Sequence, residues 1–446
     1  MTQQPLLRTL GLREAAALVI GTVIGTGVFI KTAVMSQQAG SPAWVLAAWA
    51  AAGALSLTGA LTYAELGALF PQAGGEYVYM KEAYGPLAGF LYGWTRVWIA
   101  SPGSIAAYSV GAATFLSALT PLGGHRDAAA VGLILVFTAL NCLSVAFGGK
   151  LQAAMTALKV VMIAGLSAAL LLFARGATWE HLSSPSGAGF HGWRLFGAAV
   201  LSALWAFDGW NNLPMAAGEI REPGHVIPRA LGLGMLAVLA LYALANLAYF
   251  YALPFGEILT SYSTAHRDAL PVAAKAAGTA FGPLAVRLLS GAFVFSALGA
   301  MNGSILTGAR VPYAMARDGL FFKSLGSVNG ATRVPVVAVL AQGAWACVLA
   351  LSGTFDQLTD YVVFASWIFY ALCTASLFVF RRRLPLAQRP YLAPGYPWVP
   401  ALFLACSLLL LANTLASSPR ESLIGLGFIA AGAPAYLLFR RRREPA

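Results

Sequence analysis

Two stretches decide the fold of this chain: Gly21-Thr-Val-Ile-Gly-Thr-Gly-Val-Phe-Ile30 and Trp205-Ala-Phe-Asp-Gly-Trp-Asn-Asn-Leu-Pro214. Each lies near the middle of a long apolar run. Glycine costs about 1 kcal/mol in a helix interior, so the three glycines of the first stretch favour an open helix. The second stretch combines Asp, Gly, two Asn and Pro, which are also poor helix formers. We expect both helices to be interrupted.

The composition places these runs in a membrane. Of the 446 residues, 59% are hydrophobic and 10% are charged, whereas soluble domains carry about 25% charged residues. A spanning helix needs about 20 apolar residues. The sequence therefore predicts an all-α integral membrane protein with twelve transmembrane helices, which we place at residues 14–35, 41–66, 86–118, 129–147, 150–174, 195–219, 228–252, 281–313, 334–352, 357–380, 398–416 and 422–440.

The net charge of +12 reports topology and not a nucleic-acid partner. Most of the 28 Lys and Arg fall on the side of the N-terminus once loops are assigned from the apolar runs. This is the positive-inside bias. It predicts a multi-pass protein of the plasma or inner membrane with cytoplasmic tails at residues 1–13 and 441–446.

The two interrupted spans, the first and the sixth, stand five spans apart. Interrupted backbone at bilayer depth is tolerated only where it lines a protein cavity. Paired interruptions in corresponding halves are typical of inverted-repeat transporters, whose substrate site lies between the halves. We therefore expect a repeat at 14–174, a second at 195–380 and two further helices at 398–440.

The first interruption predicts an anion site. If the helix opens at Gly25, Thr26 and Gly27, the outer half-helix begins with unpaired N–H groups of Thr26, Gly27 and Val28. These donors and the positive end of the helix dipole suit a carboxylate. The alternative is close helix packing, because Gly21 and Gly25 form a G-x-x-x-G pair.

The second interruption predicts an ammonium site and a gate. Unwinding around Phe207, Asp208 and Gly209 frees carbonyls that would act with those near residues 23 and 24. Trp205 or Phe207 would close over the substrate, and Asn211 would line or brace the pocket floor. Asp208 has two interpretations, a helix N-cap or a role in handling cations or protons.

Lys159 lies nine residues after Lys150, which we place at the cytoplasmic surface. That is about 13 Å into a core of about 30 Å, too deep for a lysine to reach the surface comfortably. We expect the carbonyls of the broken first helix to hold its ammonium, in the place where sodium-coupled carriers with broken helices hold a cation. The alternative is a shifted span that leaves Lys159 near the interface.

Cysteine and histidine positions indicate neither disulfides nor metals. All four cysteines lie inside apolar runs, so we predict no structural disulfide. The five histidines lie in separate loops without metal-ligand spacing. No cofactor, metal site or catalytic residue is predicted.

Several motifs resemble the L-type amino acid transporter family of the amino acid–polyamine–organocation superfamily. They are Ile24-Gly-Thr-Gly-Val-Phe29, Tyr63-Ala-Glu-Leu-Gly-Ala-Leu-Phe-Pro71, Gly74-Gly-Glu-Tyr77, Trp205-Ala-Phe-Asp-Gly-Trp-Asn211, Gly218-Glu-Ile-Arg-Glu-Pro223, Ile227-Pro-Arg229 and Asn302-Gly-Ser-Ile-Leu-Thr307. The resemblance implies the LeuT-type fold, with two five-span inverted repeats plus two further helices, helices 1 and 6 broken mid-membrane, and alternating access.

The resemblance also implies roles for single residues. The family's carboxylate-binding backbone falls on Thr26 and Gly27, its gating aromatic on Trp205, and its span-five lysine, associated with sodium-independent transport, on Lys159. The cysteine that links eukaryotic members to a glycoprotein heavy chain has no counterpart in residues 119–128, so we expect no disulfide-linked heavy chain. Asp208 replaces the glycine of some members that carry large neutral substrates.

We therefore predict sodium-independent transport of L-amino acids, especially neutral ones, by exchange or facilitated alternating access. The amino acid and the lipid bilayer are the expected partners. The substrate ammonium would meet carbonyls near Val23, Ile24, Trp205 and Phe207. The alternatives are a proton-coupled symporter in which Lys159 or Asp208 titrates, an intramembrane enzyme and a channel. The enzyme lacks paired acid–base groups at bilayer depth, and the channel lacks repeated filter segments.

Overall fold

The computed structural model describes residues 6–119, 125–183, 189–263, 265–266, 269–352, 355–385, 387–417 and 419–441. Within these ranges the chain is helical, with a single isolated β-bridge between Leu10 and Ile220. Eight helices are long and apolar enough to cross a membrane, or nine if one bent pair counts as a span. The chain is an all-helical integral membrane protein.

The first half of the chain begins with the bent pair, α1 (Leu12–Val23) and α2 (Gly27–Ala39), whose axes differ by 43°. The elements that follow are α3 (Pro42–Leu69), α4 (Glu76–Tyr84), α5 (Pro86–Thr95), the π-helix η1 (Arg96–Ala100), α6 (Ser101–Leu119), α7 (Arg126–Leu143), α8 (Val145–Phe173) and the short α9 (Glu180–Ser183).

The second half begins with α10 (Trp193–Ala206), which is followed by turns and by α11 (Asn212–Met215) and η3 (Ala217–Glu219). Next come α12 (Pro223–Ala252), α13 (Phe255–Leu259), α14 (Val272–Phe281), α15 (Leu284–Gly308), α16 (Arg310–Arg317), η4 (Lys323–Gly326), α17 (Val336–Ser352), α18 (Phe355–Arg383), α19 (Trp398–Ser417) and α20 (Pro419–Arg441). Every predicted span overlaps one of these helices or a run of consecutive ones.

One predicted boundary is wrong. The apolar pattern separates the fourth and fifth spans at residues 148–149, but the structure separates α7 from α8 at Ser144. Ser144 is extended, with φ −169° and ψ 155°, and its side chain accepts a hydrogen bond from the Phe147 N–H. Gly149 lies inside α8, where the missing Cβ leaves room for Leu10: a Cβ there would lie 2.6 Å from Leu10 Cδ2.

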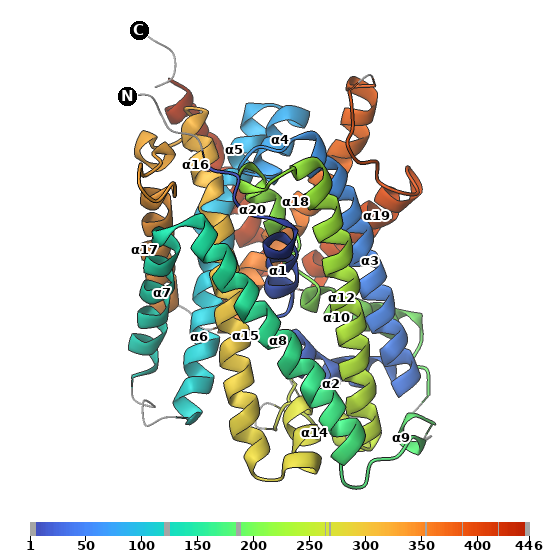
Figure 1. Cartoon of the computed structure of the whole chain (residues 1–446). Helices are drawn as coiled ribbons and strands as arrows, with labels where there is room; N and C mark the ends of the chain where they lie inside the picture. Colours follow the sequence, from blue (N-terminus) through green and yellow to red (C-terminus); the bar gives the residue numbers. More distant parts are fainter. Residues whose placement is uncertain are drawn as a thin grey trace.

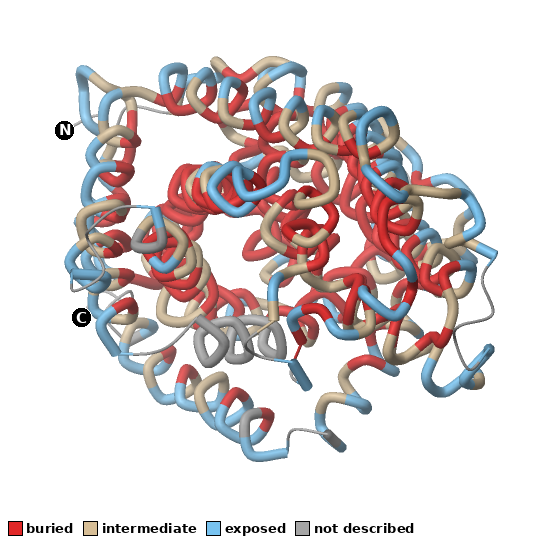
Figure 2. Tube along the Cα trace, turned by 90° about the horizontal axis from the view of Figure 1, so that it is seen from below, coloured by how far each residue is buried: buried red, intermediate tan, exposed pale blue. Residues whose placement is uncertain are grey.

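The two broken regions lie inside the helical bundle. In Figure 1, α1 occupies the middle of the molecule, with α4 and α16 at one end and α9 and α14 at the other. Helix α1 packs against α8, α12 and α15, whereas α2 packs against α10. Figure 2 shows buried positions on the inner sides of the helices and exposed positions on the perimeter.

A buried ion pair ties three segments together at the end that carries α4 and α16. The Arg310 guanidinium donates to both carboxylate oxygens of Glu219, at 2.8 and 2.9 Å, and neither side chain is more than 1% exposed. The Glu219 carbonyl also accepts the N–H groups of Thr9 and Leu10. Bidentate charge-assisted bonds of this kind are geometrically specific, so they hold η3, α16 and the segment before α1 in register.

A second, half-buried ion pair at this end gives a test of surface electrostatics. Lys81 Nζ lies 2.8 Å from Asp318 Oδ2, which also accepts the Tyr77 hydroxyl. Burial lowers the pKa of Lys81, but the hydrogen bond and charge of Asp318, with a smaller contribution from Glu82, outweigh it and raise the pKa above its ordinary value. The stabilisation is then fully present below the pKa of the unfolded lysine and is lost as pH rises through the folded pKa.

We expect Asp318→Asn to lower the unfolding temperature slightly, by the equivalent of at most about 1 kcal/mol. The difference from the parent should stay constant between about pH 7 and 9, because lysine titrates above that range. Thermal unfolding in detergent measures it, with Glu82→Gln, whose carboxylate lies 3.4 Å from Lys81 and is more exposed, as the control. A difference that disappears by pH 9 would contradict this account.

Candidate functional site

The break between α1 and α2 leaves a set of unpaired backbone donors. Helix α1 ends at Val23, Ile24 is extended, and α2 begins at Gly27. In the described part of the chain, the N–H groups of residues 25–28 have no backbone acceptor. A Cβ built on Gly25 would have no atom within 4 Å, so open space adjoins this turn. The positive end of α2 can therefore receive an anion.

The carbonyl groups of the same break are held by two neighbouring helices. Lys159 of α8 is 1% exposed, and its Nζ donates to the carbonyls of Gly21 and Ile24 at 2.6 and 2.7 Å. The single hydroxyl proton of Ser296, on α15, is shared between the carbonyls of Gly25, at 2.9 Å, and Ile24, at 3.3 Å. A single fixed ammonium thus occupies the carbonyl side of the open turn. The N–H groups on the other side of the turn have no backbone acceptor in the described residues.

The second break touches the first. Helix α10 ends at Ala206 and residues 207–211 form turns, in which Gly209 has a φ of 116° that disfavours any side chain. A Cβ on Gly209 would lie 2.8 Å from the Thr22 carbonyl oxygen. The Thr22 hydroxyl, whose nearest acceptor is the Leu18 carbonyl at 2.6 Å, lies 3.0 Å from the Gly209 carbonyl oxygen. The Tyr242 hydroxyl lies 3.2 Å from the Val23 carbonyl oxygen and 3.1 Å from that of Ala206, so its one proton is shared between them. These contacts hold the ends of α1 and α10 next to each other.

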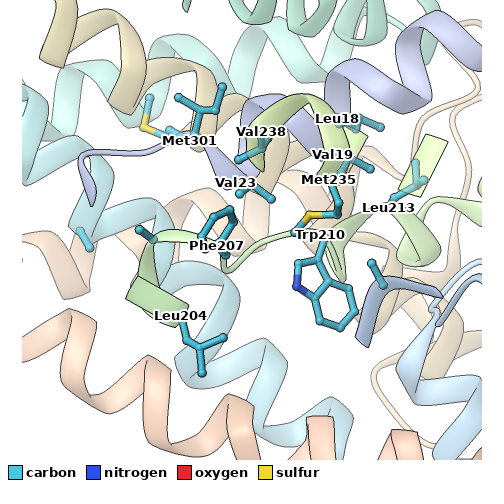
Figure 3. Close-up of a cluster of buried hydrophobic side chains, with 14 of the residues drawn as sticks. Leu18, Val19, Val23, Leu204, Phe207, Trp210, Leu213, Met235, Val238 and Met301 are labelled. Carbon is cyan, nitrogen blue, oxygen red and sulfur yellow. The ribbon is translucent and has the colours of Figure 1, made fainter. Parts of the chain in front are cut away.

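The structure separates the two aromatic gate candidates. Phe207 is fully buried, with its ring 5.8 Å from that of Trp49 and 5.1 Å from that of Tyr242. Figure 3 shows it in an apolar cluster with Val23. Trp205 is only partly buried, and Lys31 Nζ lies 4.6 Å from its ring centroid. Phe207 is a core residue, which leaves Trp205 as the gate candidate.

Asp208 and Asn211 are hydrogen-bonded to side chains from other helices. The Tyr370 hydroxyl of α18 donates to Asp208 Oδ1 at 2.7 Å. The N-cap position of α11 is Asn211 and carries no side-chain cap, so Asp208 does not act as the cap of that helix. Asn211 Nδ2 donates to Glu76 Oε2 at 3.2 Å.

Glu76 is the functional candidate that sequence reasoning missed. From the sequence alone, the semi-polar segment 71–81 predicts a short surface helix. In the structure Glu76 is fully buried and accepts hydrogen bonds from Tyr63, Tyr92 and Asn211. In the sequence, the Gly74-Gly75 pair was the feature that could have indicated that this segment is buried. Gly75 has a φ of 52°, and a Cβ there would lie 2.8 Å from the Met215 N. This close approach brings α4 into the bundle.

A narrow cavity adjoins this network on the side of α5, η1 and α18. It is lined by Glu76, Tyr92, Thr95, Arg96, Ala100, Asn211, Ser366, Phe369 and Tyr370. The guanidinium of Arg96 donates through Nη2 to Asn212 Oδ1 and to Met215 Sδ. In the described ranges no group of three His, Cys, Asp or Glu side chains could hold a metal ion.

Comparison with known proteins gives a consistent result. Residues 10–436 match the family model described as amino acid permease. The serine/threonine exchanger SteT of Bacillus subtilis (strain 168) is 32% identical over 441 residues, 98% of each chain. The human b(0,+)-type amino acid transporter 1 is 32% identical over 97% of this chain and 88% of its own. The human cystine/glutamate transporter is 30% identical, with 97% and 85% coverage.

Proposed function

Because this chain belongs to the amino acid permease family, we propose that it is a sodium-independent exchanger of L-amino acids, especially neutral ones. Members of this family are transport proteins and not enzymes. The relatives whose names include exchange or transport of amino acids match this chain over nearly its whole length. The observation that carries the proposal lies at the break between α1 and α2. This break combines N–H groups that have no backbone acceptor in the described residues with carbonyls that bind the Lys159 ammonium.

The proposed architecture has twelve crossings. The repeats occupy 14–174 and 195–380, and two further helices occupy 398–440. The α1–α2 and α10–α11 interruptions stand at corresponding places of the two repeats, at bilayer depth. Tails 1–13 and 441–446 are cytoplasmic, and the protein resides in the plasma or inner membrane. The positive-inside bias supports this orientation.

The substrate carboxylate binds the N–H groups of Thr26, Gly27 and Val28, next to the open space at Gly25. The ammonium binds carbonyls near residues 23, 24, 205 and 207. Those of Val23 and Ile24 already accept bonds from Tyr242, Lys159 and Ser296. The Trp205 carbonyl accepts the Asp208 N–H at 3.3 Å, whereas in the described residues the Phe207 carbonyl has no backbone donor. The Phe207 carbonyl therefore contributes most to binding of the substrate ammonium. Trp205 gates the site, and Asp208 and Asn211 border it.

Sodium independence follows from Lys159. Sodium-coupled carriers hold the ion with unwound carbonyls, and here the carbonyls of Gly21 and Ile24 already hold an ammonium. A proton-coupled mechanism is the second candidate, because Asp208 is a carboxylate at the broken segment, bonded to the Tyr370 hydroxyl. Uptake stimulated by an acid-outside gradient and lost in Asp208→Asn would favour that mechanism.

We propose further that the protein works without a disulfide-linked heavy chain. Its four cysteines are Cys142, Cys347, Cys373 and Cys406, and residues 119–128 contain none. A non-reducing gel of the protein from its native membrane, compared with a reduced sample, tests this: a band that shifts on reduction would contradict it.

Counterflow in proteoliposomes tests the exchange function. Vesicles preloaded with unlabelled alanine should take up labelled alanine several-fold faster than empty vesicles, and replacing sodium by choline should leave the rate unchanged. Protein-free vesicles are the control. If none of the twenty amino acids enters, with or without preload, the proposed function is refuted.

A further inference from the structure

The narrow cavity beside Asn211 adjoins the unwound part of the second break. Asn211 ends that segment, and Tyr370, another lining residue, is bonded to Asp208 within it. The cavity has room for about one water-sized group. A substrate whose carboxylate is held at the N-terminus of α2 would extend its side chain along residues 208–211. A small terminal group of that side chain could then enter the cavity.

Arg96 gives the cavity unused hydrogen-bond donors. A guanidinium has five N–H donors, and in the described part of the chain only Nη2 of Arg96 has acceptors, Asn212 Oδ1 and Met215 Sδ. The Nε–H is buried with no partner. Among the described residues, no carboxylate forms an ion pair with Arg96 within 4.0 Å. A buried donor without an acceptor is costly, so an acceptor that enters this cavity relieves that cost.

The Glu76 carboxylate also lines the cavity, but its oxygens already have hydrogen-bond donors. Glu76 already accepts three bonds, from the hydroxyls of Tyr63 and Tyr92 and from the amide of Asn211. The carboxyl groups of Glu76 and Asp208 both lie close enough to the Arg96 guanidinium to interact with it electrostatically. A carboxylate side chain would therefore gain little net attraction, and a cationic one would face the Arg96 guanidinium. A neutral oxygen acceptor satisfies the remaining donors.

We propose that this cavity is a side-chain subsite in which Arg96 donates a hydrogen bond to an uncharged oxygen of the substrate. The subsite selects hydroxyl- and amide-bearing amino acids over apolar and acidic ones of the same size. This inference rests on the proposed exchange function and names its preferred substrate class.

The wild-type protein supplies the first test. Competition against labelled alanine in proteoliposomes compares matched pairs: threonine with valine, asparagine with leucine and glutamine with methionine, with aspartate and glutamate as charged analogues. A hydrogen bond to a charged donor corresponds to about tenfold or more in affinity. We expect at least one polar member to bind about tenfold better than its apolar partner and better than its acidic analogue. Equal binding within every pair overturns the subsite.

Variants of Arg96 supply the second test. Arg96→Met keeps the length of the side chain and removes its donors, so the polar-to-apolar ratio should fall to about one while apolar substrates are still exchanged. Arg96→Lys keeps a donor and should retain part of the ratio. Arg126→Gln, at an exposed position at the start of α7, is the matched control. Equal losses for polar and apolar substrates would show a purely structural role for Arg96 and overturn the proposal.

The wild-type competition remains decisive if Arg96→Met does not fold. Failure of this inference is also distinct from failure of the proposed function. In the first case alanine is exchanged without a preference for oxygen-bearing side chains, and in the second case no amino acid is exchanged at all.

Discussion

Amino acid exchange by Lys159→Met should be at least about 100-fold slower than that of the parent. The substitution removes two charge-assisted hydrogen bonds, to the carbonyls of Gly21 and Ile24, each worth about 1.5–3 kcal/mol. The Gly21 carbonyl would then lack its donor from α8, and the open turn would lose the group that holds its shape. Initial rates of counterflow, at equal amounts of reconstituted protein, measure the effect.

The control is Lys150→Met, which removes an exposed lysine from the same helix. It should change the rate little. A normal counterflow rate in Lys159→Met would show that transport does not require the ammonium.

The effect of sodium on the exchange rate distinguishes two roles of Lys159. Its ammonium either replaces a coupling cation or only supports the local structure. Lys159→Ala leaves space next to the carbonyls of Gly21 and Ile24 and the hydroxyl of Ser296. These are oxygen ligands of the kind that carriers use for sodium. Sodium should therefore raise the rate of Lys159→Ala relative to choline and leave that of the parent unchanged. Equal rates in the two salts would show that the site does not accept the ion.

Gly27→Val should slow exchange by about tenfold to 100-fold. A Cβ at Gly27 would lie 2.5 Å from Ala206 Cβ and 2.9 Å from Ala206 Cα. The second of these is a backbone atom, which cannot rotate away. Overpacking of this kind costs about 1–3 kcal/mol, and here it would push the N-terminus of α2 away from the end of α10. Counterflow rates and thermal unfolding of the purified variant together measure the change.

Two glycine variants serve as controls for Gly27→Val. Gly165→Ala, at an exposed position of α8 with nothing within 4 Å of the new methyl, should behave as the parent. Gly25→Ala also meets no atom, so the protein should fold normally, but the methyl would enter the proposed carboxylate space and raise KM. Normal transport by Gly27→Val would mean that the close approach of α2 and α10 is not required.

Part of this molecule follows from local sequence. Apolar runs predict the helices because each span buries its own backbone hydrogen bonds. The glycines of residues 21–27 weaken the first helix at the place where α1 ends and α2 begins. The α7–α8 boundary could not be placed in this way. Gly149 looks like a helix breaker in isolation, but it lies against Leu10, which is distant in the sequence.

Local sequence likewise predicts some residues of the candidate site and not others. The depth of Lys159 follows from counting residues along one helix, so its need for an internal partner could be predicted. Glu76, Arg96 and Asn211 could not be grouped from the sequence, because they come from α4, η1 and the turn before α11. Each looks like an isolated polar residue until the bundle is assembled.

The sequence by itself determined the membrane class, the family and the positions at which the backbone opens, because hydrophobicity and the helix propensities of Gly, Asn and Pro act over a few neighbouring residues. Only the tertiary structure decided which partners the opened groups find. It placed the ammonium of Lys159 on carbonyls more than a hundred residues away, buried Phe207 in the core while Trp205 stayed at its edge, and gathered Glu76 and Arg96 around one cavity. Such pairings depend on how distant helices pack, which no local propensity specifies.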